Sequence, residues 1–317
     1  MKRMVLTAVA LAMAAFAWGT GAAQGGLQTV RLAIGYIPHV QFTPLYVGVD
    51  KGFYKDEGID LQLSFGFQYD VFSLLAAGKI DVGLSDSDQL IIAGAKGMGL
   101  QAIFQYYQQY PITIVARAGI SAPADLAGKT VGTPELSGSA WIGLQLFLKK
   151  YGLEKDVTVQ KIGYTQEATL MAGRADAVVC FYNNEPVLLR SKGVAFQEWD
   201  VKDLSDMVGA SFISSRAIIS SRTDTLARFV RATRKAMAWT VDNRDEAEQI
   251  AMKNVGNVLP ADEPLFRERL DATVALFGGP QAYGALDAGR YTRSIAELAA
   301  LGLIPQAYPT DTILHSF

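Results

Sequence analysis

The chain has too few thiol and imidazole side chains to build the commonest disulfide and metal sites. Its 317 residues include one cysteine and two histidines. A single cysteine excludes a disulfide within the chain, and one cysteine with two histidines is a poor ligand set for zinc. The sequence therefore predicts no metal site and no disulfide framework.

An excess of charge of one sign is also missing. Lys and Arg number 29 against 31 Asp and Glu, which gives a formal net charge of -2. Because nucleic-acid binding depends on neutralising phosphates, this balance gives no support to a nucleic-acid partner. Charged residues make up 19% and hydrophobic residues 50% of the chain, which indicates a folded protein. Its length suits one large domain or two compact lobes.

A long apolar run is absent, and the most apolar segment lies at the N-terminus. The chain begins with Met-Lys-Arg, continues with a mostly apolar run over residues 5–18, and then has small residues up to Ala23. The run is shorter than the ~20 residues of a spanning helix. We predict a signal peptide over residues 1–23 and a periplasmic mature protein without a lipid anchor, because no cysteine lies near the cut. The alternative is an uncleaved anchor.

Beyond this leader, β-rich segments alternate with helical ones. Such alternation predicts an α/β fold in which helices cover both faces of mostly parallel sheets. The expected β-rich segments are residues 30–34, 60–65, 80–84, 112–117, 129–132 and 213–220. The expected helices are residues 43–51, 69–77, 223–241 and 287–300.

Two distant segments repeat one pattern. Residues 75–81 read Leu-Ala-Ala-Gly-Lys-Ile-Asp, and residues 170–176 read Leu-Met-Ala-Gly-Arg-Ala-Asp. Each is followed by an apolar strand, a polar cluster and a helix that ends near Lys-Gly. A glycine that ends a helix and a strand that delivers polar groups at its carboxyl end are features of α/β ligand sites. We predict two α/β lobes of the same kind; the alternative is chance similarity between generic βα units.

The lobe boundaries are expected at the β-rich runs over residues 112–117 and 213–220, where one α/β segment ends and the next begins. We assign residues 27–114 and 217–317 to lobe I, and residues 115–216 to an inserted lobe II. Two connections then join the lobes as a hinge. Ligands favour such clefts between lobes, where strand ends face each other.

Four segments resemble a known protein family over nearly all of the predicted mature chain. They are Gly-Tyr-Ile-Pro at residues 35–38, Lys-Gly-Phe-Tyr-Lys-Asp-Glu-Gly-Ile at 51–59, Leu-Ala-Gly-Lys-Thr-Val-Gly at 126–132, and Ala-Gly-Arg-Ala-Asp-Ala at 172–177. They are similar to the thiamin-pyrimidine-synthase-like and sulfonate/nitrate-type periplasmic binding proteins of ABC importers. The resemblance implies a two-lobe periplasmic-binding-protein fold of type II, a monomer, and an ABC permease in the inner membrane as partner.

Shorter segments resemble one branch of that family. Tyr-Asn-Asn-Glu-Pro at residues 182–186 is similar to a segment of proteins that bind formylaminopyrimidine or riboflavin. Residues 108–111 and 139–144 look more like the riboflavin-type binders. The resemblance implies riboflavin as the first candidate ligand, formylaminopyrimidine as the second, and a sulfonate or nitrate as the third.

Candidate binding residues follow the carboxyl ends of the expected strands. They are mainly aromatic or uncharged and polar, which suits a flat heteroaromatic ligand held by stacking and by hydrogen bonds at its edge. No Lys or Arg is among them, which disfavours a strong anion, although helix N-termini alone can hold one. The set is His39, Gln41, Phe42, Phe67, Tyr69, Ser85, Asp86, Tyr107, Gln108, Ser137, Ser139, Trp141, Tyr182, Asn183 and Glu185.

Several of these residues have structural alternatives. Trp141 can face the core, and Ser137, Asp86 and Glu185 can each cap the helix that follows. Glu185 has a second reading, because a carboxylate can pair with an aminopyrimidine edge. Asn183 and Asn184 each offer a donor and an acceptor together, as an imide edge requires.

The resembled family also contains enzymes that make the thiamin pyrimidine from their own histidine and a lysine-bound pyridoxal phosphate. Those enzymes carry a cysteine-rich iron-binding segment, whereas here the corresponding region holds only Cys180, in an apolar strand. His39 has no visible partner for a nucleophile–base pair, and no phosphate-binding loop or metal motif is present. We predict no catalytic residue, no cofactor and no enzymatic activity, with a pyrimidine-synthesising enzyme as the alternative.

Overall fold

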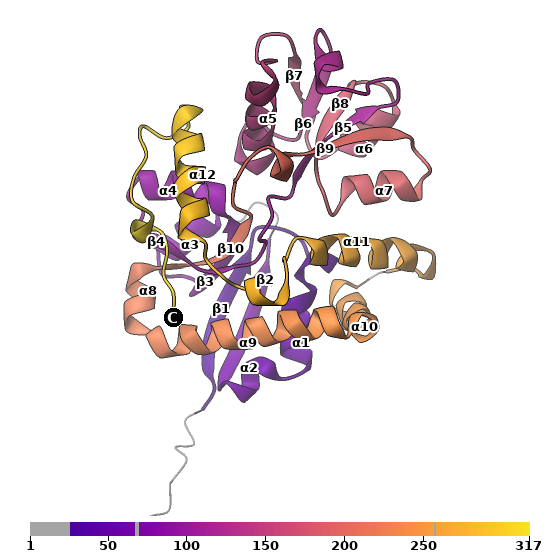
Figure 1. The fold of residues 1–317 in the computed structure, drawn as a ribbon. Helices are drawn as coiled ribbons and strands as arrows, with labels where there is room; N and C mark the ends of the chain where they lie inside the picture. Colours follow the sequence, from indigo (N-terminus) through magenta and orange to yellow (C-terminus); the bar gives the residue numbers. More distant parts are fainter. Residues whose placement is uncertain (1–25, 67–69, 257) are drawn as a thin grey trace, which may run out of the picture.

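The computed structural model describes residues 26–66, 70–256 and 258–317. Within them, two sheets of five strands are each covered by helices, and they form two lobes with the C-terminal helices packed around the first (Figure 1). The predicted signal peptide over residues 1–23 lies outside the described residues. No helix in the described ranges combines the length and the apolar character needed to cross a membrane.

The sheet of lobe I has the strand order β2-β1-β3-β10-β4. β1 runs parallel to β2 and β3, whereas β10 is antiparallel to both of its neighbours. The strands are β1 (Gln28–Ile34), β2 (Ile59–Phe65), β3 (Val82–Asp86), β4 (Leu100–Gln105) and β10 (Ala210–Ser215).

The sheet of lobe II has the order β7-β6-β8-β5-β9. β6 is parallel to β7 and β8, and β5 is antiparallel to β8 and β9. Strand for strand, this repeats the arrangement of lobe I. The strands are β5 (Ile112–Arg117), β6 (Thr130–Thr133), β7 (Thr158–Lys161), β8 (Ala177–Phe181) and β9 (Phe196–Asp200).

Alternation along the strands sends apolar side chains to both faces of each sheet, so helices must cover both. In β1, Leu32 packs with the face formed by α1 and α9, whereas Ala33 packs with the face formed by α4 and α12. Lobe I carries α1 (Thr43–Asp50), α2 (Phe53–Asp56), α3 (Val71–Ala76), α4 (Ser87–Ala95), α8 (Arg216–Ser221), α9 (Thr223–Asp242), α10 (Arg244–Val255), α11 (Glu263–Ala275) and α12 (Ala288–Ala300). Lobe II carries α5 (Gly138–Tyr151), α6 (Gln166–Met171) and α7 (Glu185–Ser191).

The repeated sequence pattern occupies equivalent places in the two lobes. Asp81 Oδ2 accepts the backbone N–H of Arg31 at 2.8 Å, and Asp176 Oδ2 accepts that of Thr130 at 2.9 Å. Each aspartate directly precedes one parallel strand and ties it to the strand beside it. The prediction of two α/β lobes of the same kind is confirmed.

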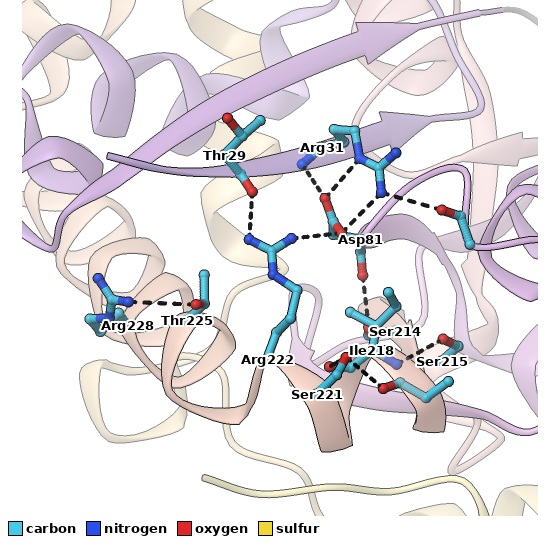
Figure 2. A network of polar contacts seen from close by, with 12 residues as sticks. Thr29, Arg31, Asp81, Ser214, Ser215, Ile218, Ser221, Arg222, Thr225 and Arg228 are labelled. Carbon is cyan, nitrogen blue, oxygen red and sulfur yellow. Dashed lines mark hydrogen bonds and ion pairs between the residues drawn. The ribbon is translucent and has the colours of Figure 1, made fainter. Parts of the chain in front are cut away.

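Asp81 is also the centre of an ion-pair network in lobe I (Figure 2). Its side chain is 2% exposed and lies 3.0 Å from Arg31 Nε and 2.7 Å from Arg222 Nη1. Arg222 Nη2 also donates to the Thr29 carbonyl at 2.6 Å. Because Arg222 lies between α8 and α9, the network fastens the C-terminal helices to the first sheet.

The lobe boundaries differ from the expected positions. β5, which the boundary at 114/115 would divide, lies wholly in the second sheet, and β10, expected in lobe II, lies wholly in the first. The connections between the lobes are therefore the segments between β4 and β5 and between β9 and β10. A buried strand looks alike in either sheet, because its pairing partners and not its own residues decide its place.

The β-rich run expected over residues 213–220 is only partly a strand. β10 ends at Ser215, and residues 216–221 form α8. Ser215 Oγ accepts the backbone N–H of Ile218 at 3.3 Å, which makes it a helix N-cap. This capping bond outweighs the strand preference of the isoleucines that follow.

Candidate ligand-binding site

A cavity of about 420 Å³ lies between the two lobes. Its walls are the segments that follow β1 and β3 in lobe I and β6 and β8 in lobe II, together with the connection after β4. The carboxyl ends of parallel strands thus meet across the cleft, as the strand-end rule predicts. The volume falls in the range usual for sites that bind small molecules.

Most of the predicted site residues line this cavity. They come from both lobes, so a ligand in the cavity contacts both at once. The set is His39, Gln41, Phe42, Ser85, Asp86, Tyr107, Ser137, Ser139, Asn183 and Glu185.

Three predicted site residues do not line the cavity. Trp141 packs against the apolar core, because two positions after Ser139 the helix has turned away from the cleft. Tyr182 packs against lobe I with Lys202 Nζ 4.8 Å from its ring centroid. Gln108 Nε2 donates instead to the carbonyls of Ala282 and Ala285, at 2.6 and 3.0 Å.

Phe67 and Tyr69 lie outside the described residues. Asn184, named beside Asn183 as an edge-reading residue, also lines the cavity. Sequence reasoning missed several lining residues, which are Tyr36, Tyr106, Pro134, Glu135, Tyr164, Gln166 and Phe181. Glu135 and Tyr164 follow β6 and β7, so the strand-end rule could have found them. β7 itself was not expected, because its short sequence Thr-Val-Gln-Lys has only one apolar residue.

An aromatic wall in lobe I is held in place by hydrogen bonds to one residue. Tyr106 Oη donates to the Gln41 carbonyl at 2.7 Å, and Tyr107 Oη donates to Gln41 Oε1 at 3.2 Å. The two tyrosine rings lie 4.9 Å apart, and Phe277 stacks behind Tyr107 with an interplanar angle of 21°. The wall is therefore rigid, which reduces the entropy that a stacked ligand would cost.

The lobe II wall is built on the turn between β8 and α7. Glu185 Oε2 accepts the Phe181 backbone N–H at 2.9 Å, and Glu185 Oε1 accepts Asn184 Nδ2 at 3.2 Å. Burial raises the pKa of Glu185, and the bond from Phe181 opposes that rise. Its carboxylate thus braces the turn and does not cap the helix.

Asn183 joins the lobes on one side of the cavity. It is 1% exposed, and its Nδ2 donates to Thr273 Oγ1 at 2.8 Å. Thr273 belongs to α11 of lobe I, which packs beside α7 of lobe II (Figure 1). This side of the cleft is therefore fastened by a buried hydrogen bond between lobes.

A cluster of acids and hydroxyls joins the lobes on the other side. Ser139 Oγ of α5 lies 2.8 Å from Asp86 Oδ2 and 2.9 Å from Asp88 Oδ1, both of lobe I. Tyr110, from the connection after β4, reaches Asp88 Oδ2 at 2.7 Å and the Ser139 carbonyl at 2.9 Å. Burial, and then the charge of Asp88, raise the pKa of Asp86 to about 7. Neither Asp86 nor Ser137 caps its helix through its side chain.

The cavity is acidic. Among the described lining residues are the carboxylates of Asp70, Asp86, Glu135 and Glu185, and none of the described lining residues is Lys or Arg. Burial, and then the charge of Arg269, lower the pKa of His39 to about 4, so its imidazole is neutral near pH 7. Such a lining favours a neutral ligand or one that donates hydrogen bonds, and it opposes an anion.

Cys180 is placed for packing and not for chemistry. Cys180 is fully buried in β8, and burial raises the pKa of its thiol well above the ordinary value. A thiol in that state is a packing group and not a nucleophile. The described residues hold no cluster of three or more His, Cys, Asp and Glu side chains placed to bind a metal ion.

Comparison with known proteins agrees with the fold and the cleft. The model of a family described as NMT1/THI5 like matches residues 39–247. The chain belongs to the NMT1/THI5-like family. The matched range includes the cleft residues of both lobes from His39 to Glu185. The match confirms the family that the short sequence segments indicated.

Three proteins named for what they bind or make are similar to this chain over most of their length. The riboflavin-binding protein RibY of Chloroflexus aurantiacus is 30% identical over 292 residues, which cover 89% of this chain and 83% of that protein. The formylaminopyrimidine-binding protein of Halalkalibacterium halodurans is 27% identical, over 99% of this chain and 98% of that protein. A 4-amino-5-hydroxymethyl-2-methylpyrimidine phosphate synthase of Legionella pneumophila is 24% identical, over 84% of this chain and 86% of that protein.

A solved structure supports the architecture. The periplasmic aliphatic sulphonate binding protein SsuA of Escherichia coli superposes with a TM-score of 0.71 over 90% of this chain and 96% of that protein, at 17% identity. The predicted fold class, a two-lobe α/β periplasmic-binding-protein fold, is thereby confirmed.

Proposed function

We propose that this protein is the periplasmic solute-binding component of an ABC importer and that it captures a heteroaromatic vitamin or vitamin precursor, with riboflavin as the first candidate. It would act as a monomer that delivers the ligand to a permease in the inner membrane. The observation that carries the proposal is the cavity between the lobes, which combines an aromatic wall, neutral polar groups and carboxylates.

The face and the edge of a flavin ring both have suitable partners in this lining. Tyr36, Tyr164 and Phe181 line the cavity with part of their rings exposed, and they offer surface on which a flat ring stacks. The buried Tyr106 and Tyr107 support the lobe I wall. Gln41, Asn183 and Asn184 offer amide donors and acceptors for the edge of the ring system. The similarity to a riboflavin-binding protein and to a formylaminopyrimidine-binding protein supports a heteroaromatic ligand.

Binding would proceed by closure of the lobes. The contacts of Ser139 with Asp86 and of Asn183 with Thr273 exist only when the lobes meet, and they flank the cavity. A ligand that touches both lobes gains its full binding energy only in that closed form. It therefore shifts the population towards closure, and the closed form is the one presented to the permease.

Formylaminopyrimidine is the second candidate. Glu185 favours it, because a carboxylate can pair with an aminopyrimidine edge. However, both Glu185 oxygens already accept hydrogen bonds within lobe II. A sulfonate is third, because the lining has carboxylates and its described residues include no Lys or Arg. The remaining alternative is a pyrimidine-synthesising enzyme, which would need His39 and would turn over with iron and pyridoxal phosphate.

A ligand panel read by thermal unfolding tests these alternatives. We expect riboflavin to raise the unfolding temperature of the chain without residues 1–23, whereas an alkanesulfonate leaves it unchanged. Glu185→Gln removes the charge and one of the two acceptor oxygens, so the turn loses one of its two bonds. Riboflavin should still stabilise this variant. Stabilisation by the aminopyrimidine alone, lost in Glu185→Gln, would replace the first candidate by the second.

A further inference from the structure

In the acid and hydroxyl cluster between the lobes, the hydroxyls of Ser139 and Tyr110 make more short contacts with acceptors than they have protons to donate. Ser139 Oγ lies 2.8 Å from Asp86 Oδ2 and 2.9 Å from Asp88 Oδ1. A serine hydroxyl has one proton to donate, and an ionised carboxylate has none. Ser139 can therefore satisfy one carboxylate, and the second contact is a hydrogen bond only if an aspartate carries a proton.

Tyr110 does not supply the missing proton. Its single hydroxyl proton faces two acceptors, Asp88 Oδ2 at 2.7 Å and the Ser139 carbonyl at 2.9 Å. Gln89 Nε2 donates to Asp88 Oδ1 at 3.1 Å, but it does not reach the contact between Ser139 and Asp86. The two hydroxyls thus face four acceptor contacts with two protons.

The surroundings bring no positive charge to balance two carboxylates. Asp88 is fully buried, and neither Asp86 nor Asp88 takes part in an ion pair with a described residue. Tyr107 and Tyr110 face the pair from the connection after β4. From α12, Tyr291 Oη donates to Ser87 Oγ, and Arg290 donates to the carbonyls of Gln108 and Met207.

We propose that the Asp86–Asp88 pair holds one shared proton in the closed form, and that closing the cleft therefore takes up a proton. One aspartate donates this proton to Ser139 Oγ, which donates its own to the other aspartate. A continuous chain of hydrogen bonds then joins α5 of lobe II to β3 and α4 of lobe I. When the lobes separate, water replaces Ser139, and the proton is released as the pair ionises.

The direction of the pH dependence follows from this linkage. In the open form, a hydrated Asp86 ionises near its ordinary pKa of about 4. In the closed form, burial and the charge of Asp88 raise the pKa of Asp86 to about 7. The closed form is therefore favoured at low pH, and this advantage is lost as the pH rises through about 7. Between the two values, the ratio of closed to open protein falls by up to about tenfold per pH unit.

The test measures closure without any ligand, so it does not depend on the proposed function. Donor and acceptor fluorophores are placed on Val49→Cys in lobe I and Met171→Cys in lobe II, positions that are 40% and 53% exposed. The native Cys180 is fully buried and stays unlabelled. Energy transfer is then followed from about pH 5 to about pH 8.5. We expect transfer to fall as the pH rises.

Two variants and a control identify the groups involved. Asp88→Asn supplies an amide donor without a titratable proton, so closure should persist to higher pH. Ser139→Ala removes the hydroxyl between the acids, so less closed protein should form at low pH. Asp60→Asn removes a carboxylate from β2 of the same lobe and should follow the wild-type curve.

Carbon-13 NMR of labelled aspartate gives a second measurement on the unmutated chain. We expect one aspartate carboxyl to titrate near neutral pH. Energy transfer that does not change with pH would overturn the proposal, and so would an Asp88→Asn curve that coincides with the wild-type curve. A failure of riboflavin to bind would leave all of these expectations unchanged.

Discussion

The buried amide of Asn183 stabilises the closed cleft through its hydrogen bond to Thr273 of the other lobe. The donor is 1% exposed, and the two residues come from different lobes. In the open form, water satisfies both side chains. In the closed form, their mutual bond replaces water, so this contact contributes to closure and through it to affinity.

Thr273→Val should therefore weaken riboflavin binding. Valine has the same shape but removes the Thr273 acceptor, so the Asn183 amide keeps only its contact with Tyr107. The lost bond should cost about 1–3 kcal/mol, or roughly tenfold in affinity. Thr292→Val removes a hydroxyl that bonds only within its own exposed helix turn and should leave affinity unchanged. Fluorescence titration of both variants checks this, and equal affinities would mean that the contact plays no part in closure.

At the level of single residues, the sequence revealed side-chain chemistry better than side-chain direction. The strand-end rule found His39, Asp86 and Glu185, because a residue that follows a parallel strand lies at the cleft edge whatever its type. It failed for Trp141 and Tyr182, which share the cleft segments but point into packed apolar regions. Whether a side chain points into the cleft or into the core changes within one or two residues along a strand or helix. Strand and helix boundaries inferred from sequence are not accurate to one or two residues.

At the level of elements, the two lobes are variations of one unit. Asp81 and Asp176 make the same backbone contact, but their surroundings differ. Asp81 is 2% exposed and paired with two arginines, whereas Asp176 is 21% exposed and paired with Arg117. Burial opposes the ionisation of Asp81, yet the bonds from Arg31 and Arg222 outweigh it and lower its pKa.

We expect Asp81→Asn to cost about 2–4 kcal/mol of unfolding free energy, because two arginines lose a buried anion. Asp176→Asn, the same change in the more exposed site, should cost about 1 kcal/mol. A lowered pKa adds stability above the ordinary value of about 4, and this stability is lost as the pH falls through the lower native value. The unfolding free energies of the Asp81→Asn and Asp176→Asn variants should therefore differ less in strongly acidic buffer than at neutral pH.

Urea denaturation at neutral and acidic pH measures both differences. An equal loss in the two variants would contradict the role given to Arg222, since it is the partner that only Asp81 has.

Much of the element order could be predicted from the sequence. Periodic segments such as residues 223–241 were found because one apolar stripe against a polar face is a helix signal that needs no tertiary partner. The places of β5 and β10 could not be predicted, because each is a buried strand that either sheet could accept. β7 escaped for the opposite reason, since an exposed edge strand carries little apolar signal.

At the level of the whole molecule, the charge of the cavity decides which ligands it can hold. The protein has a nearly neutral balance overall, but its cavity gathers carboxylates, and no lining residue among those described is Lys or Arg. Glu135 pairs with Lys161, and the charge of Arg269 acts on Glu185, so cations support the acids from outside the lining. A neutral ring that donates hydrogen bonds suits such a cavity, and a phosphate does not.

Titration of the chain without residues 1–23 with riboflavin, followed by flavin fluorescence, shows whether riboflavin is the ligand. We expect stoichiometric quenching. We also expect flavin mononucleotide, which has the same ring and an added phosphate, to bind at least about tenfold more weakly. Absence of quenching would contradict riboflavin as the ligand and put formylaminopyrimidine first. Equal or tighter binding of the mononucleotide would contradict the role assigned to the acidic lining.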